Sequence, residues 1–277
     1  MSEDFLAGMA ASSSARVAAA RATLPDGELL ARALETPLPP RLTLSPQGFD
    51  LIAEVKLRSP AMGLLRAAEE NLAARVVDYA SAGAAAVSVL TEPDRFDGSL
   101  EDLQLATRAL RDRVPTMRKD FLVDPYQVME ARLAGAGGVL VILRMLSLEQ
   151  NAALIECATK LGLFVLLEAF DEADIAQAER LLRTHAAAAT RAQAPLLVGV
   201  NCRDLVTLQV MPGRLEQMAP LLPRDAPHVA ESGVVSATDA GRLSAAGYDL
   251  ALVGGALMRA VDALQLVRAM LAAGRTA

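Results

Sequence analysis

Short apolar runs alternate with helical patterns along the chain from about residue 50 onward. Eight such runs occur, at residues 51–56, 86–90, 115–119, 138–143, 163–168, 196–201, 227–231 and 249–253. Their starts lie about 22 to 35 residues apart, which leaves room for a strand, a helix and two short loops. Eight βα units of this kind predict an α/β fold, a single (β/α)8 TIM barrel.

The main competing fold is a doubly wound open sheet. Such sheets commonly have about five or six strands and a glycine-rich phosphate turn after the first strand. No G-x-G-x-x-G pattern follows Lys56, so the barrel is favoured.

Helix-start signals support the predicted ends of the strands. A capping side chain that is followed three residues later by a carboxylate or amide satisfies the free N–H groups at the start of a helix. The four pairs are Ser99 with Asp102, Asp124 with Gln127, Ser147 with Gln150, and Ser236 with Asp239.

The first 50 residues have a different pattern. Residues 4–22 and 26–34 are expected to be helical, and a proline-rich linker follows them. We therefore expect residues 1–48 to form an N-terminal helical extension with its linker, and residues 49–277 to form the catalytic barrel domain.

Composition and charge exclude several classes of protein. The net charge is −6 and no basic block occurs, so a nucleic-acid partner is not expected. The longest uncharged stretch, residues 79–91, is too short to cross a membrane. Acidic residues near the start argue against a secretory signal, so a cytoplasmic protein is expected. Two cysteines and two histidines without ligand spacing indicate neither disulfides nor a metal site.

Polar residues end several of the predicted strands, at the edge where barrel enzymes build their active sites. Glu54 and Lys56 share one face of the first strand because side chains alternate along a strand. A structural ion pair would also explain this pair. The residues that end the later strands are Lys119, Glu168, Asn201 with Arg203 beyond it, and Glu231. Burying so many charges is costly unless they are paired or functional, and crowding would shift their pKa values, so a lysine is a plausible general acid.

Glycines follow the last two strands, where barrel enzymes commonly hold a phosphate. Ser232 and Gly233 follow the seventh strand, and Gly254 and Gly255 follow the eighth. Ser59, just after the first strand, adds a hydroxyl group. These positions predict a site for a small phosphorylated substrate.

The order of these motifs resembles the indole-3-glycerol phosphate synthase family over roughly residues 50–272. The matching strings include Ile52-Ala53-Glu54-Val55-Lys56 with Ser59-Pro60, Arg118-Lys119-Asp120-Phe121, Asn201-Cys202-Arg203-Asp204-Leu205, Glu231-Ser232-Gly233 and Val253-Gly254-Gly255-Ala256-Leu257-Met258. The resemblance implies closure of 1-(2-carboxyphenylamino)-1-deoxyribulose 5-phosphate to indole-3-glycerol phosphate, with loss of carbon dioxide and water and without metal or organic cofactor.

The resemblance also implies roles for the candidate residues. Lys119 would protonate the ketone oxygen, Lys56 and Glu54 would serve the loss of water, and Glu168 would orient Lys119. Asn201, Arg203 and Glu231 would bind the sugar hydroxyls and the substrate carboxylate or hold the polar network. Ser59, Ser232, Gly233, Gly254 and Gly255 would bind phosphate, and Phe96 would shape the anthranilate pocket.

Three positions depart from the family pattern. Met62 stands where the family often has a lysine, Phe170 replaces a frequent histidine, and Gly255 replaces a frequent polar or acidic residue. These changes keep open a paralogue that takes a modified anthranilate. The pattern is also compatible with an isomerase or epimerase acting on another sugar phosphate, or with a non-catalytic barrel subunit, and it leaves the oligomeric state open.

Overall fold

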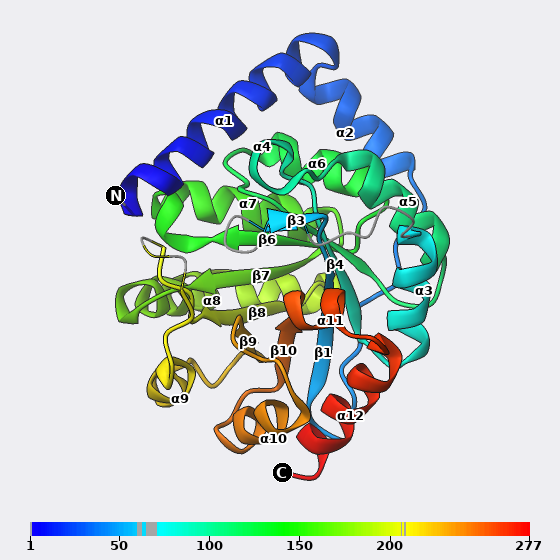
Figure 1. Ribbon diagram of the computed structural model, residues 1–277. Helices are drawn as coiled ribbons and strands as arrows, with labels where there is room; N and C mark the ends of the chain where they lie inside the picture. Colours follow the sequence, from blue (N-terminus) through cyan, green and yellow to red (C-terminus); the bar gives the residue numbers. More distant parts are fainter. Residues whose placement is uncertain (1, 60–62, 65–70, 206, 208) are drawn as a thin grey trace.

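The computed structural model describes residues 2–59, 63–64, 71–205, 207 and 209–277, and parallel strands within them close into one barrel (Figure 1). Each barrel strand pairs with its neighbours in chain order, and the first strand also pairs with the last. The strands are β1 (Asp50–Val55), β4 (Ala86–Leu90), β5 (Thr116–Lys119), β6 (Gly138–Ile142), β7 (Phe164–Ala169), β8 (Leu196–Asn201), β9 (His228–Glu231) and β10 (Leu250–Val253). The predicted single (β/α)8 barrel is confirmed.

Helices connect the strands and cover the outside of the barrel (Figure 1). They are α3 (Leu72–Ser81), α5 (Leu100–Leu110), α6 (Pro125–Leu133), α7 (Leu148–Lys160), α8 (Glu172–Ala192), α9 (Arg214–Met218), α10 (Ala237–Ala245) and α12 (Ala263–Arg275). Shorter elements are α4 (Pro93–Phe96), α11 (Gly255–Arg259), η1 (Leu143–Met145), η2 (Ala219–Leu221) and a hairpin of β2 (Arg58–Ser59) with β3 (Gly63–Leu64).

The four predicted helix starts are all observed, although their caps differ. Ser147 and Ser236 form reciprocal capping boxes with the side chains three residues later. Ser99 caps α5 through the backbone N–H of Asp102. Asp124 instead accepts a hydrogen bond from the N–H of Tyr126, and the Gln127 side chain accepts one from the N–H of Val123.

Two apolar layers hold the barrel together. Inward-facing side chains such as Ile52, Leu166 and Leu197 fill the interior, and outward-facing side chains such as Leu51 and Val165 pack against the helices. Because strands of a parallel barrel are covered on both faces, they are continuous apolar runs rather than alternating ones. This packing fixes the strand ends, and with them the polar residues at one rim.

The N-terminal segment forms α1 (Ser2–Thr23) and α2 (Asp26–Glu35), which make a V along one side of the barrel (Figure 1). The α1 helix is attached to the loop after β5, because Ser13 donates a hydrogen bond to the carbonyl oxygen of Phe121 and Arg16 pairs with Asp120. The Tyr126 hydroxyl also donates to the carbonyl oxygen of Leu24. These contacts bring the start of the chain next to the rim of the barrel.

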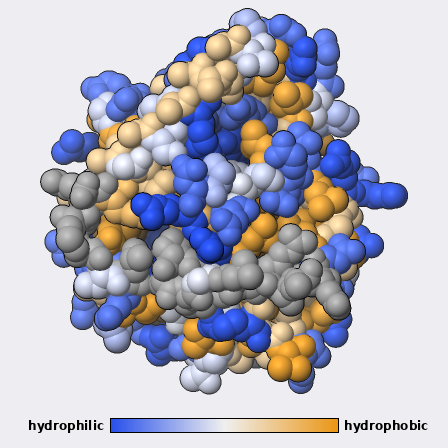
Figure 2. Space-filling model, turned by 45° about the horizontal axis from the view of Figure 1, so that its top comes forward, coloured by the Kyte–Doolittle hydropathy of each residue, from blue (hydrophilic) through white to orange (hydrophobic). Residues whose placement is uncertain are grey.

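Figure 2 shows hydrophilic residues gathered in a hollow of the surface. No helix in the described residues is long and apolar enough to cross a membrane. Within the same residues, no group of three or more His, Cys, Asp or Glu side chains is arranged to hold a metal ion.

Candidate active site

The carboxyl ends of the strands surround a cavity of about 370 Å³. Most of the predicted site residues line it: Glu54, Lys56, Phe96, Lys119, Glu168, Asn201, Arg203, Glu231, Ser232, Gly233, Gly254 and Gly255. Ser59 lies in β2, but its side chain is outside the described part of the chain, and so is Met62. The structure therefore brings together residues that the sequence places on separate segments.

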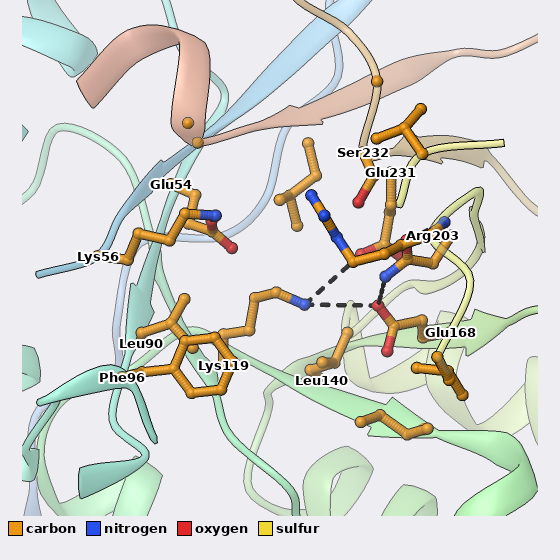
Figure 3. Close-up of a pocket in the computed structure, with 18 of the residues that line it drawn as sticks. Glu54, Lys56, Leu90, Phe96, Lys119, Leu140, Glu168, Arg203, Glu231 and Ser232 are labelled. Carbon is orange, nitrogen blue, oxygen red and sulfur yellow. Dashed lines mark hydrogen bonds and ion pairs between the residues drawn. The ribbon is translucent and has the colours of Figure 1, made fainter. Parts of the chain in front are cut away.

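Lys119 is the centre of the polar cluster. Its Nζ atom lies 3.5 Å from Oε1 of Glu168 and 3.7 Å from Oε2 of Glu231. The Asn201 amide donates to the same Oε1 of Glu168 at 2.9 Å. Burial lowers the pKa of Lys119, but the negative charges around it, that of Glu168 first, outweigh burial and hold this pKa above its usual value. The ammonium is therefore charged at neutral pH, and Figure 3 shows it pointing toward Glu168 from the centre of the cavity.

A second pair lies on the other side of the cavity (Figure 3). Lys56 Nζ is 2.5 Å from Oε1 of Glu54, as expected for two side chains on one face of the first strand. Burial raises the pKa of Glu54, but the nearby charges of Lys56 and Lys119 outweigh burial, so this pKa is lowered overall. Glu54 is thus a carboxylate at neutral pH, able to accept a proton.

Glu231 has the opposite electrostatics. It is 1% exposed, and among the described residues neither of its carboxyl oxygens accepts a hydrogen bond. Burial, followed by the negative charge of Glu168, raises the pKa of Glu231 well above its usual value. The neutral acid is favoured, and in that form it can donate a hydrogen bond to Glu168. Three glutamates around two lysines are therefore not equivalent: Glu54 is ionised, whereas Glu231 tends to hold a proton.

The loop after β9 has a left-handed backbone at two successive residues. Ser232 and Gly233 both have positive φ, at 68° and 73°. A Cβ at Gly233 would also lie 3.0 Å from Val210 and 3.2 Å from the sulfur of Cys202. Gly254 and Gly255 lie at the start of α11, after the last strand. All four residues line the cavity, at the rim after β9 and β10.

An apolar wall faces the polar cluster, and sequence reasoning found only part of it. Phe96, which was predicted, packs at 6.2 Å between ring centroids against Phe121. Phe5 of α1 packs edge-on against the same ring at 5.9 Å, and Leu6 also lines the cavity. Phe170 contributes another part of the wall and lies under the Arg144 guanidinium. The sequence near the start of α1 contains no pattern from which the position of Phe5 and Leu6 in the cavity wall could be predicted.

Asp120, which directly follows Lys119, is fixed by a buried network. Its carboxylate lies 3.0 Å from Arg118, 2.9 Å from Arg16 and 2.9 Å from the Thr91 hydroxyl. Burial raises its pKa, but the charges of Arg118 and Arg16 and the hydrogen bonds outweigh burial and lower it to about 2. This network links α1, the residue that follows β4, and the end of β5, where Asp120 is next to Lys119 in the sequence.

Comparisons with known proteins agree on one family. The family model for indole-3-glycerol phosphate synthase matches residues 6–270. The enzyme of that name from Parafrankia sp. (strain EAN1pec) is 43% identical over 224 residues, covering 81% of this chain and 78% of its own. The one from Dehalococcoides mccartyi (strain CBDB1) is 36% identical over 252 residues, covering 90% of this chain and 92% of its own.

Solved structures show the same fold at much lower sequence similarity. A 3-hexulose-6-phosphate synthase from Salmonella typhimurium superposes with a TM-score of 0.58 at 16% identity, covering 82% of this chain and 99% of its own. This likeness concerns the barrel alone. The match of the family model and of the relatives, however, spans the cavity and every strand that builds it. The chain therefore belongs to the indole-3-glycerol phosphate synthase family, the carboxy-lyases of tryptophan biosynthesis.

Proposed function

We propose that the cavity closes the indole ring of 1-(2-carboxyphenylamino)-1-deoxyribulose 5-phosphate through proton transfers by its buried lysines and glutamates. The observation that carries this proposal is the placement of the Lys119 ammonium between Glu168 and Glu231, beside the Lys56–Glu54 pair. The substrate has an aromatic ring, a chain of hydroxyls and a phosphate. An apolar wall, a polar centre and a glycine-lined rim match these three parts in turn.

In the first step, the ring carbon that bears the carboxylate attacks the ketone carbon, and the carbonyl oxygen gains negative charge. Lys119 donates a proton to this oxygen, which becomes a hydroxyl group, and regains a proton from solvent, because converting the carboxylate to carbon dioxide consumes one proton overall. An ammonium fits this role, because it is charged in the resting site and an alkoxide is far more basic than an amine. Cleavage of the ring–carboxylate bond then releases carbon dioxide and returns the electron pair to the ring.

The second step is loss of the hydroxyl as water. Lys56 donates a proton to the leaving oxygen, and the Glu54 carboxylate accepts the proton released as the indole becomes aromatic. The contact of 2.5 Å between these side chains lets the base recharge the acid after each turnover. Glu168 holds Lys119 in position and is itself oriented by Asn201.

The remaining residues bind the substrate. Arg203 offers a cation for the substrate carboxylate, and its backbone N–H donates to the Asn201 side chain at 3.0 Å. The phosphate binds the N–H groups of Gly233, Gly254 and Gly255 with the hydroxyls of Ser232 and Ser59. The anthranilate ring lies against Phe96. Neither a metal ion nor an organic cofactor takes part in this scheme.

The division of the chain and its location are part of the same proposal. Residues 49–277 form the catalytic barrel, and residues 1–48 form an extension that contributes Phe5 and Leu6 to the cavity wall. The enzyme works in the cytoplasm on a small phosphorylated substrate, without a nucleic-acid partner, which the net charge of −6 supports.

A direct assay tests the proposed activity. Purified protein is incubated with the carboxyphenylamino-deoxyribulose phosphate, and indole fluorescence is followed with and without EDTA. We expect turnover that the chelator does not change. Absence of product would contradict the proposed substrate and favour a modified anthranilate, another sugar phosphate or a non-catalytic barrel, whereas product formation abolished by EDTA would contradict the metal-free mechanism.

A further inference from the structure

Gly199, in the middle of β8, leaves a space in the barrel wall that the carboxyl group of Glu231 fills. A Cβ atom at residue 199 would lie 2.2 Å from Oε1 of Glu231 and 3.0 Å from the end of the Leu166 side chain. The first distance is far inside van der Waals contact, so the carboxyl group would have to move. Gly199 is absent from the glycines with positive φ, so space rather than backbone conformation accounts for the glycine.

The strand register explains why this space matters. Gly199 on β8 pairs with Glu168 on β7, and Asn201, two residues further along β8, pairs with Glu231 on β9. Residues two apart on a strand share a face, so residue 199 faces the barrel interior directly below Asn201. The Glu231 side chain reaches back across β8 at Gly199, toward the strand that carries Glu168. A side chain at this position would take up the space in which the Glu231 carboxyl group lies.

We propose that Gly199 is a positioning residue, whose missing side chain lets the carboxyl group of Glu231 lie beside Glu168 and within ion-pair distance of Lys119. The proposal rests on the proposed function, because it concerns the proton-transfer cluster of that reaction. Among the described residues that line the cavity Gly199 is absent, so its effect on the reaction passes through the position of Glu231, the atom group nearest to it.

The charges that surround Glu231 predict what its displacement would do. Glu168 on β7, Lys119 on β5 and Glu54 on β1 face it, and burial with the charge of Glu168 favours its neutral form. Moving the carboxyl group away from Glu168 and toward the cavity mouth lowers its pKa and ends the contact of 3.7 Å with Lys119. The enzyme would then have a changed pH dependence as well as a lower rate.

The test is a double-mutant cycle between Gly199→Ala and Glu231→Asp. Aspartate is one methylene shorter, so its carboxyl group leaves room for the alanine methyl. We expect Gly199→Ala alone to lower kcat by about 10-fold to 100-fold, since a shift of about 1 Å in a reacting group can have that effect, and to shift the limb of the pH–rate profile that depends on Glu231. In the Glu231→Asp background, the same change should lower kcat by less than about threefold.

Gly138→Ala is the matched control. Gly138 is also an interior strand glycine, and its Cβ would lie 2.4 Å from the ring of Phe164, away from the polar cluster. This variant should lose thermal stability through overpacking, yet keep the wild-type pH profile, and Glu231→Asp should not restore its stability.

The kinetic and stability measurements can each overturn the positioning role of Gly199. A Gly199→Ala enzyme with kcat within about threefold of wild type and an unchanged pH profile would overturn the proposal, as would an equal loss in both backgrounds. Melting temperatures provide the same double-mutant cycle without an activity measurement. The double variant Gly199→Ala/Glu231→Asp should recover most of the stability that Gly199→Ala removes, even if Gly199→Ala alone does not fold. Failure of that recovery refutes the positioning role. Absence of turnover by the wild type would instead contradict the proposed function and leave the stability cycle to decide on Gly199.

Discussion

Replacing Asp120 with asparagine should reveal how strongly the network behind Lys119 stabilises the protein. The carboxylate is buried and pairs with Arg118 and Arg16. Asparagine has nearly the same shape but lacks the charge, and its amide N–H groups would face guanidinium donors. The substitution therefore removes the electrostatic part of the network while it leaves the packing nearly unchanged.

The pKa of Asp120 gives the size of the effect. It falls from 3.8 to about 2 on folding, and at about 1.4 kcal/mol for each pH unit this corresponds to about 2 kcal/mol of stability at pH 7. Because the folded pKa lies below the unfolded one, this stability is fully present above about pH 4 and is lost as the pH falls toward 2. The substitution also leaves the buried Arg118 with one fewer anionic partner, which would raise the total loss of unfolding free energy to about 3–5 kcal/mol.

Urea unfolding of wild type and Asp120→Asn at several pH values measures this contribution. The difference in unfolding free energy should be at least about 2 kcal/mol at pH 7, and its charge-dependent part should fall by about half at pH 3. The exposed Asp225→Asn serves as the control and should change stability by less than about 0.5 kcal/mol. A difference for Asp120→Asn that is the same at both pH values would contradict an electrostatic origin for this stability.

Three further substitutions test the site. Lys119→Met should lower kcat by about 100-fold or more if Lys119 is the general acid, and steady-state kinetics near the wild-type rate would remove it from the mechanism. Glu231→Gln should be at least as stable as wild type at pH 7, because a raised pKa means that the ionised carboxyl costs stability above its unfolded pKa; a loss of more than about 2 kcal/mol in urea unfolding would contradict this. Phe5→Ala should raise KM severalfold with little change in unfolding free energy, since the ring lies in the cavity wall, and an unchanged KM would show that α1 makes no contact with the substrate.

The barrel was predictable because its signal is local and repeated. Each strand is a short apolar run with a polar end, and the predicted bounds agree with the observed strands to within about one or two residues. Lys56 was placed at the end of the first strand, whereas β1 ends at Val55. The polar candidates were found for the same reason, since the rim of a barrel collects the residues that end its strands.

The features that could not be predicted from the sequence depend on contacts between segments that are distant along the chain. Phe5 enters the cavity wall only because Arg16 and Ser13 attach α1 to the loop after β5, and no local pattern encodes that attachment. The roles of Glu54 and Glu231 are equally hidden. Both are glutamates at strand ends, but one lies beside Lys56 and the other beside Glu168, and this difference sets their protonation in opposite directions.

The closure of the ring between β1 and β10 has a consequence for folding. Glu54 belongs to the first strand, yet its carboxylate lies where a Cβ of Gly254, just after the last strand, would be, at 2.2 Å from Oε1. The proton acceptor is therefore seated only when the two ends of the barrel sequence have met, a contact between residues 200 positions apart along the chain. Contacts of such long range carry a large loop-closure entropy and slow folding. An intermediate that lacks the final βα unit would hold most of the strands but no complete catalytic centre, so recovery of activity during refolding reports the closing of the cylinder rather than the assembly of its parts.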